Sequence, residues 1–181
     1  MRYRYKLGFT EVDFARLMFG GDYYRWAERA MERWQQDTGL GWKRMIVDLN
    51  LGLPSLETRC HHYASIAYED EFEIGVSLRN LNNRGFVSDF EFIRMADGVL
   101  AAHGYFVRRF LDMKEHRGQD DPPREAMDVF SRMAEDRDVM PYEDRRAQVQ
   151  AERDNRRNLR REPSDGADPG VADDQHRGRV A

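Results

Sequence analysis

The chain has 181 residues, enough for one ordinary domain or for a smaller domain with an extension. Its 29 Lys and Arg against 33 Asp and Glu give a net charge of −4, so the charge balance does not indicate a nucleic-acid partner. The single cysteine, Cys60, excludes an intramolecular disulfide and a zinc site built from several cysteines.

No apolar run approaches the ~20 residues that a membrane-spanning helix needs. The first five residues, Met-Arg-Tyr-Arg-Tyr, lack the apolar stretch of a secretory signal. We therefore expect a protein without a membrane partner that works in a reducing compartment, most simply the cytoplasm.

The first forty residues predict a strand and a long helix. Apolar and basic residues alternate over 2–9, as in a half-buried strand, and a loop follows over 10–19. Apolar residues then recur at helical spacing over 23–34, after Gly-Gly-Asp at 20–22 and before a terminating Gly39. Because aromatic side chains occur on more than one side of this helix, we expect other elements to surround it.

The rest of the folded part is predicted to be mostly strands. Residues 51–62, 72–78, 86–95 and 99–110 fit strands joined largely by short turns, and a short helix starts at 122. Tight turns imply antiparallel neighbours. An antiparallel sheet needs an apolar cover, and only the first helix is long enough to provide it. The expected fold is therefore α+β, with a curved antiparallel sheet wrapped around a long central helix.

The last part of the chain differs in composition. From Tyr142 onward apolar residues are scattered, and such a segment buries too little surface to offset its ordering entropy. A transient, salt-bridged helix over 145–161 is the structured alternative. We expect a domain over residues 1–134 and a charged, disordered tail over 135–181, either solvated or able to dock a partner.

Asp13 is the most suggestive candidate for chemistry. It lies in an otherwise apolar loop before the central helix, and such a setting would make a carboxylate a better base or nucleophile. The helix start offers free backbone N–H groups, and Gly20 and Gly21 would let a ligand come close. A carboxylate beside such donors suits acyl chemistry. The alternative is that Asp13 caps a turn or pairs with Arg16.

Other motifs give no site. The chain has no glycine-rich phosphate loop after a strand and no Gly-x-Ser-x-Gly elbow. The run Cys60-His61-His62 contains metal-binding residue types, but side chains of successive strand residues point to opposite faces. We therefore expect no metal site and no cofactor. His103 is expected to be a structural histidine.

One stretch resembles a known family. The residues from Asp13 to Trp26, read as Asp-Phe-Ala-Arg-Leu-Met-Phe-Gly-Gly-Asp-Tyr-Tyr-Arg-Trp, look like the signature of 4-hydroxybenzoyl-CoA thioesterase-like hot-dog proteins. Three later motifs match in order and spacing, namely Gly-Leu-Pro at 52–54, the stretch 63–72 and the hairpin 97–104. The resemblance covers about residues 2–134.

The resemblance implies a hot-dog fold, a homodimer or homotetramer with active sites between protomers, and hydrolysis of an acyl-CoA or acyl-carrier-protein thioester. By position Asp13 matches the catalytic carboxylate, and the N–H of Gly20 matches the oxyanion donor. Tyr23 matches the tyrosine of the signature and is a candidate substrate contact. Arg84 falls where relatives place basic residues against the CoA phosphates, and Glu28 is a candidate for lining the acyl pocket.

Two departures from the family pattern bear on activity. Relatives usually have glycine where this chain has Arg16, and a cation there could lower the pKa of Asp13 or block the pocket. Some relatives use a histidine where this chain has Gly20, so only the mechanism based on Asp13 is available. The hypothesis from another class is a non-catalytic hot-dog module that binds acyl thioesters or a protein partner, and Arg16 favours it.

Overall fold

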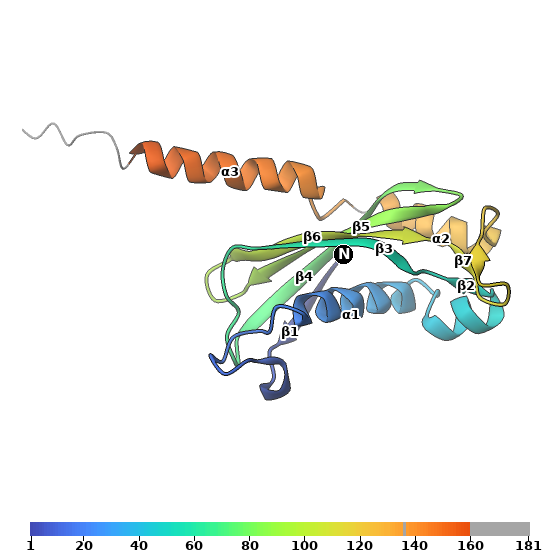
Figure 1. Ribbon diagram of the computed structural model, residues 1–181, viewed down its shortest axis with the longest axis horizontal. Coiled ribbons are helices and arrows are strands. Elements are labelled where there is room, and N and C mark those ends of the chain that lie inside the picture. The colour runs from blue at the N-terminus through green and yellow to red at the C-terminus, as the bar shows by residue number, and fades with distance from the viewer. Residues whose placement is uncertain (136, 160–181) are drawn as a thin grey trace, which may run out of the picture. The chain divides into compact units, whose positions relative to one another are not determined.

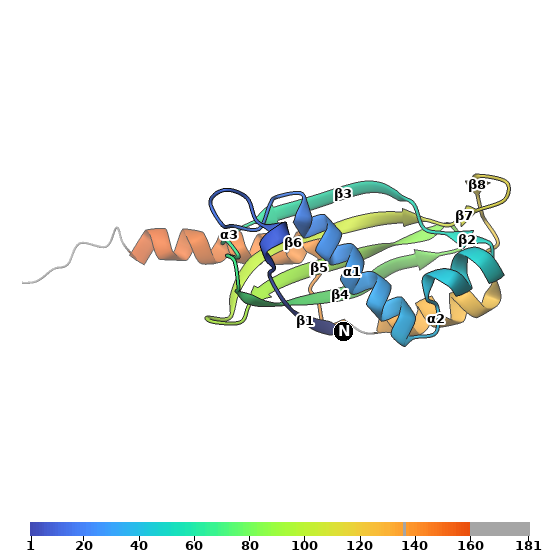
Figure 2. The ribbon, with the colours of Figure 1, turned by 90° about the horizontal axis from the view of Figure 1, so that it is seen from below.

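The computed structural model describes residues 1–135 and 137–159. Its main sheet has five antiparallel strands in the order β1-β4-β5-β6-β3. Figure 2 shows this order, with β1 and β3 at the two edges. The strands are β1 (Arg2–Lys6), β3 (Ser55–His62), β4 (Glu71–Asn82), β5 (Gly85–Arg94) and β6 (Val99–Arg109).

The long helix α1 (Asp22–Asp37) lies against one face of this sheet, called here the inner face (Figure 1). Its buried residues include Trp26, Ala30 and Trp34, which pack with inward-facing strand residues such as Phe72 and Phe92 in one core. The helix ends at Asp37. The hydroxyl of Thr38, its C-cap, donates to the carbonyl of Trp34, and Gly39 follows with a φ of +86°. The predicted α+β fold, a sheet wrapped around a central helix, is confirmed.

Shorter elements complete the domain around the far end of α1. Helix α2 (Arg124–Glu135) is the short helix predicted from residue 122; it begins two residues later, after both prolines, and buries Phe130. The short π-helix η2 (Lys43–Asp48) follows α1, where the sequence pattern predicts no helix. A small second sheet has the order β2-β7-β8, built from β2 (Leu51–Gly52), β7 (Leu111–Asp112) and β8 (Arg117–Gly118).

Two predicted strands differ from the structure. The strand expected over 51–62 is divided, because Leu53 and Pro54 lie between β2 in the small sheet and β3 in the main one. Proline has no N–H to donate to a strand ladder, which explains the break. The strand expected over 2–9 ends at Lys6, and Phe9 begins the short helix η1 (Phe9–Glu11) with 79% of its surface exposed.

The C-terminal segment differs from the predicted disordered tail and follows the helical alternative given for 145–161. Residues Tyr142–Leu159 form helix α3, and the compact unit extends from Met1 to Arg146 rather than ending at residue 134. Val139 and Tyr142 are buried in that unit. The isolated apolar residues of this segment therefore find cover that composition alone did not indicate. The part of the predicted tail over 160–181 lies outside the described residues.

No helix in the described part of the chain combines the length and the apolar character required to cross a membrane.

Candidate active site

The loop that carries Asp13 is a small hairpin fixed to the end of the main sheet. Val12 pairs with Met18, and the N–H of Asp13 donates to the carbonyl of Leu17 at 2.9 Å. Met18 in turn donates to the carbonyl of Ile66 at 2.8 Å, in the connection that follows β3. Backbone hydrogen bonds within the hairpin, together with the one to Ile66, therefore fix the position of Asp13.

Asp13 is a half-buried turn cap with one carboxylate oxygen left over. Its Oδ1 accepts hydrogen bonds from the N–H groups of Ala15 at 2.8 Å and Leu17 at 3.2 Å. Among the described residues neither a hydrogen bond to Oδ2 nor an ion pair with Arg16 is formed. Of the two structural roles that the sequence left open for Asp13, the turn cap is observed, and the pairing with Arg16 is not formed among the described residues. The two hydrogen bonds fix the side chain of Asp13 through Oδ1 and leave Oδ2 available to a ligand.

A cavity of about 570 Å³ lies beside this carboxylate. It is lined by Phe9, Val12, Asp13, Phe14, Arg16 and Tyr68. Phe14 is fully exposed and Phe9 nearly so, which is unusual for residues of this size. A contiguous exposed aromatic surface of this kind marks a ligand or protein contact.

Gly20 lies at the start of α1, near the carboxylate. Phe19 donates to the carbonyl of Glu11, and this pair lies two residues along the hairpin from the Asp13–Leu17 pair. Two residues of strand span ~7 Å. Gly20 follows Phe19 directly. A Cβ added at Gly20 would meet nothing within 4 Å. Gly21 is the N-cap of α1 and Gly20 precedes it. The N–H groups of both donate to no acceptor in the described ranges. Free donors and open space are thus both present at this end of α1.

Tyr23 lies in the core and not at the loop cavity. It is 4% exposed, and its ring packs edge-on against His62 at 4.5 Å and Phe92 at 5.1 Å. Burial raises the pKa of its hydroxyl to about 12. The structure therefore gives this residue a packing role and leaves little of it for a substrate to contact.

Glu28 faces a second, more apolar cavity of about 320 Å³ near the other end of α1. Its carboxylate pairs at 2.7 Å with Arg108, which is 7% exposed and also donates to the hydroxyl of Ser55 at 2.7 Å. Arg108 was not predicted to take part, because it reads as one more polar residue of an alternating strand. The apolar walls are Met31, Trp42, Met45, Ile46, Leu53, Pro54, Leu111 and Met113.

Arg84 lies at the opposite end of β4 from Asp13. The Asp13 hairpin bridges to Ala67, just before β4 begins, whereas Arg84 follows the end of β4, twelve residues or roughly 40 Å away. Its guanidinium is exposed and contacts Asp120 at 3.3 Å. One chain therefore does not bring Asp13 and Arg84 to the same site.

The Cys60-His61-His62 run behaves as the strand geometry predicts. His62 packs on Tyr23 on the inner face, while Nδ1 of His61 lies 2.7 Å from the hydroxyl of Tyr142 on the other face. Burial raises the pKa of the Cys60 thiol to about 12, which disfavours the reactive thiolate. Within the described residues, no three His, Cys, Asp or Glu side chains form a group that could hold a metal ion.

Comparison with known proteins identifies the family. The model of the thioesterase-like superfamily matches residues 7–150. The chain belongs to the thioesterase-like superfamily. The match spans the Asp13 hairpin, both cavities and the start of α3, so the whole described site falls within the superfamily domain. No curated protein matches the sequence.

Solved structures show the same fold at low identity. The superfamily member described here is similar to BH1999, a gentisyl-coenzyme A thioesterase, with 24% identity, a TM-score of 0.61, and coverage of 72% of this chain and 99% of that one. It is similar to Slr0204, a 1,4-dihydroxy-2-naphthoyl-CoA thioesterase from Synechocystis, with 15% identity, a TM-score of 0.65, and coverage of 72% and 94%. The hypothetical protein SAV2348 from Staphylococcus aureus, solved in complex with CoA, has 13% identity, a TM-score of 0.70, and coverage of 78% and 87%.

Proposed function

We propose that this superfamily member hydrolyses an acyl thioester carried by CoA or by an acyl carrier protein. The observation that carries the proposal is the Asp13 carboxylate, which is fixed through Oδ1 and presents Oδ2 beside an open cavity. The superfamily match and the thioesterases among the similar structures support the reaction class.

The chemistry needs two groups on opposite sides of a thioester carbonyl. Asp13 either attacks the carbonyl carbon or removes a proton from the water that does so. The carbonyl oxygen takes up the negative charge, and the N–H of Gly20 at the start of α1 stabilises it. When the carbonyl re-forms, the C–S bond breaks and the thiolate leaves; in the base route Asp13 gives the proton it took from water to the departing sulfur. In the nucleophile route water then hydrolyses the anhydride formed with Asp13. No cofactor is needed for these steps.

A second copy of the chain would complete the site. In the described part of the chain, no strand pairs with the free side of β3, whose residues are mostly exposed along its eight-residue length. The Asp13 hairpin lies by the end of β3, while Pro54 and the Glu28 cavity lie by its beginning. If two copies pair antiparallel through β3, the end of one strand meets the beginning of the other. Asp13 of one copy would then face the Glu28 cavity and the Arg84 turn of its partner.

In this assembly the other predicted site residues, Glu28 and Arg84, would also have roles. The apolar cavity beside Glu28 would take the acyl group, and the exposed Arg84 would lie where a CoA phosphate could reach it. Phe14, fully exposed in one copy, would be covered in the assembly. Homodimer and homotetramer are both compatible with pairing through β3.

A non-catalytic module that binds acyl thioesters is the second candidate. The observation that favours it is the structural role of Asp13, whose Oδ1 already accepts two backbone hydrogen bonds. In such a module Asp13 would shape the loop, and the thioester would be bound without reaction.

The test is thioester hydrolysis by the wild type and by Asp13→Asn, followed with a thiol reagent over a panel of aryl and aliphatic acyl-CoAs. The amide oxygen of Asn can still accept from Ala15 and Leu17, so the loop should keep its shape. We expect the variant to lose roughly 10²–10⁴-fold in kcat, the usual contribution of such a group.

Asp97→Asn is the matched control, because Asp97 also accepts a backbone N–H two residues on, that of Val99 at 3.2 Å. It should hydrolyse at the wild-type rate. Equal rates in wild type and Asp13→Asn would remove Asp13 from the mechanism. Binding of acyl-CoA without hydrolysis of any substrate would establish the binding module instead.

A further inference from the structure

A ten-residue segment crosses the outer face of the main sheet, the face away from α1. We call this segment, residues 137–146, the strap. Over β4, the carbonyl of Val139 accepts from the hydroxyl of Ser77 at 3.1 Å. A side chain at Gly75 would collide with Val139, since its Cβ would lie 2.7 Å from that residue. Over β5, the N–H of Tyr142 donates to Asp89 at 3.1 Å.

At its far end the strap reaches the edge strand β3. The hydroxyl of Tyr142 lies 2.7 Å from Nδ1 of His61, and it also hydrogen-bonds with the side chain of Arg59. The strap therefore spans the sheet from β4 to the strand whose other side is open. Whatever releases the strap also frees the outward side chains of β3.

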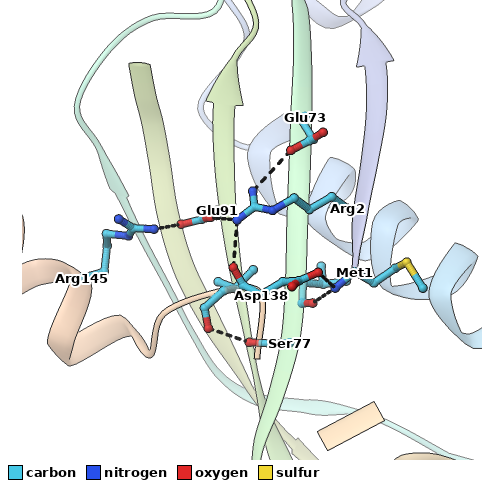
Figure 3. Close-up of polar contacts among 9 residues, drawn as sticks. Met1, Arg2, Glu73, Ser77, Glu91, Asp138 and Arg145 are labelled. Atoms are coloured by element: carbon cyan, nitrogen blue, oxygen red, sulfur yellow. Dashed lines mark hydrogen bonds and ion pairs between the residues drawn. The ribbon is translucent and has the colours of Figure 1, made fainter. Parts of the chain in front are cut away.

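The docked strap closes over carboxylates that are almost fully buried. Glu91, 1% exposed, lies between Arg2, at 2.5 Å, and Arg145 of the strap (Figure 3). Arg2 also donates to the strap carbonyl of Asp138 at 2.9 Å. Asp89, 2% exposed, is bound by Arg79 at 2.7 Å. Each buried carboxylate thus has a cationic partner, which is the condition for keeping it ionised out of water.

His103 on β6 is buried under the strap, with the Glu91 carboxylate and the Arg145 guanidinium as its charged neighbours. It is 2% exposed and lies opposite Glu91 of β5 and opposite His61 of β3. The ring of Tyr142 covers it at 4.8 Å, and the ring of Tyr63 stacks on it at 5.3 Å. Burial lowers its pKa to about 4. The backbone of Tyr142 and the carboxylate of Glu91 favour a positive charge there, whereas His61 and Arg145 of the strap oppose one.

We propose that the strap is a pH-sensitive clamp, docked while His103 is neutral and released when His103 takes up a proton. A protonated imidazole is best stabilised by water or by an unpaired anion. The docked strap keeps water out, Arg2 and Arg145 occupy Glu91, and the backbone of Tyr142 offsets only part of the cost of burial. Undocking removes Tyr142 and Arg145 from above His103 and lets water reach it. Release also detaches Tyr142 from His61 and Arg59, so acid loosens the edge strand β3.

The direction in which pH shifts the docking of the strap follows from which state binds more protons. The docked pKa of His103 is about 4 against an ordinary value of ~6.5, so the undocked state binds more protons as the pH falls. Docking is fully stable above pH ~6.5 and weakens down to about pH 4. The raised pKa of Asp89, caused by burial and opposed by Arg79, acts in the other direction. For His103 alone, the docking equilibrium should fall roughly 20-fold between pH 7 and pH 5.

The test measures hydrogen-exchange protection factors of the strap in the full chain at pH 7.0 and pH 5.0, with Tyr142 as the reporter amide. Protection factors are corrected for the pH dependence of unprotected exchange, so they report docking alone. We expect protection in the wild type to fall by up to ~20-fold at pH 5.0 while that of α1 is unchanged. His103→Phe, which fills the same space without a titrating group, should keep its protection at pH 5.0.

His116→Asn is the matched control, since His116 is an exposed histidine and Asn tolerates its φ of +50°. It should lose protection as the wild type does. If α1 protection shows that His103→Phe does not fold, His103→Gln supplies the same neutral test. Tyr142→Ala should leave the strap unprotected at both pH values with α1 intact. An acid loss of equal size in the neutral variants, or no loss in the wild type, overturns the proposal.

Discussion

Arg16 illustrates how one residue departs from its family pattern without losing the fold. It adopts a φ of +61°, in the left-handed region where an ordinary side chain is strained and glycine is not. This backbone requirement is consistent with the glycine that the family resemblance leads us to expect at the position. The guanidinium lines the cavity beside Asp13 but does not pair with it in the described structure. The strain therefore belongs to the loop, independently of any effect on chemistry.

Arg16→Gly should stabilise the protein, because it removes the left-handed strain at a position that makes no ion pair in the described residues. The expected gain in unfolding free energy is about 0.5–1 kcal/mol, after allowing for the greater freedom of glycine in the unfolded chain. Chemical denaturation measures it.

The same substitution of Arg by Gly, made in a helix, is the control for this prediction. Arg132→Gly, on the exposed side of α2, should destabilise by about 1 kcal/mol. A loss of stability in Arg16→Gly similar to that of Arg132→Gly would show that the left-handed conformation carries no cost.

Two neighbouring strands, β3 and β6, approach closely where β6 has Gly104. Cys60 and Gly104 are partners in this ladder. A Cβ at Gly104 would lie 2.0 Å from the carbonyl oxygen of Arg59 and 2.5 Å from the ring of Phe90. Backbone on one side and a buried ring on the other cannot both move aside. The glycine is therefore required by the packing of these elements and not by a turn.

Gly104→Ala should cost about 3 kcal/mol or more of unfolding free energy, at the upper end of overpacking effects, because β3 must shift to make room. Urea denaturation followed by circular dichroism measures the change.

Gly20→Ala is the matched glycine variant, since its added methyl group meets nothing within 4 Å. Its stability should stay within about 0.5 kcal/mol of wild type. Equal stability of Gly104→Ala and Gly20→Ala would contradict the close approach of β3 and β6.

The whole molecule leaves one edge of its main sheet open. β3 has eight residues, its free side has no strand partner among the described residues, and exposed edges of this length normally pair or carry protective charges. The two cavities lie near opposite ends of this strand. Antiparallel pairing of two copies would unite them, which is why we treat the assembly as part of the proposed site.

We expect wild-type protein to sediment at two or four times the 21.4 kDa chain mass. Thr58→Lys places a charge on the exposed middle of β3 and should shift the protein toward monomer, with loss of any hydrolase activity. Ser131→Lys, on exposed α2, should sediment as the wild type does. A monomeric wild type that hydrolyses acyl-CoA would refute the composite site.

The sequence by itself determined the order of the main elements, because their signals are local. Alternation defined β4, helical spacing and Gly39 defined α1, and the Asp97-Gly98 turn defined the β5–β6 hairpin. Asp13 and the glycines at the helix start were also identified from local pattern.

Only the tertiary structure decided which of these residues share a site. It separated Asp13 from Arg84 by the length of β4, placed Tyr23 in the core, and paired Arg108 with Glu28 across eighty positions of the chain. It also placed residues 137–146 over the outer face, where Glu91 looks like a solvent-facing residue of an alternating strand until the strap covers it. Such contacts depend on the path of the chain between distant segments, and no local periodicity encodes that path.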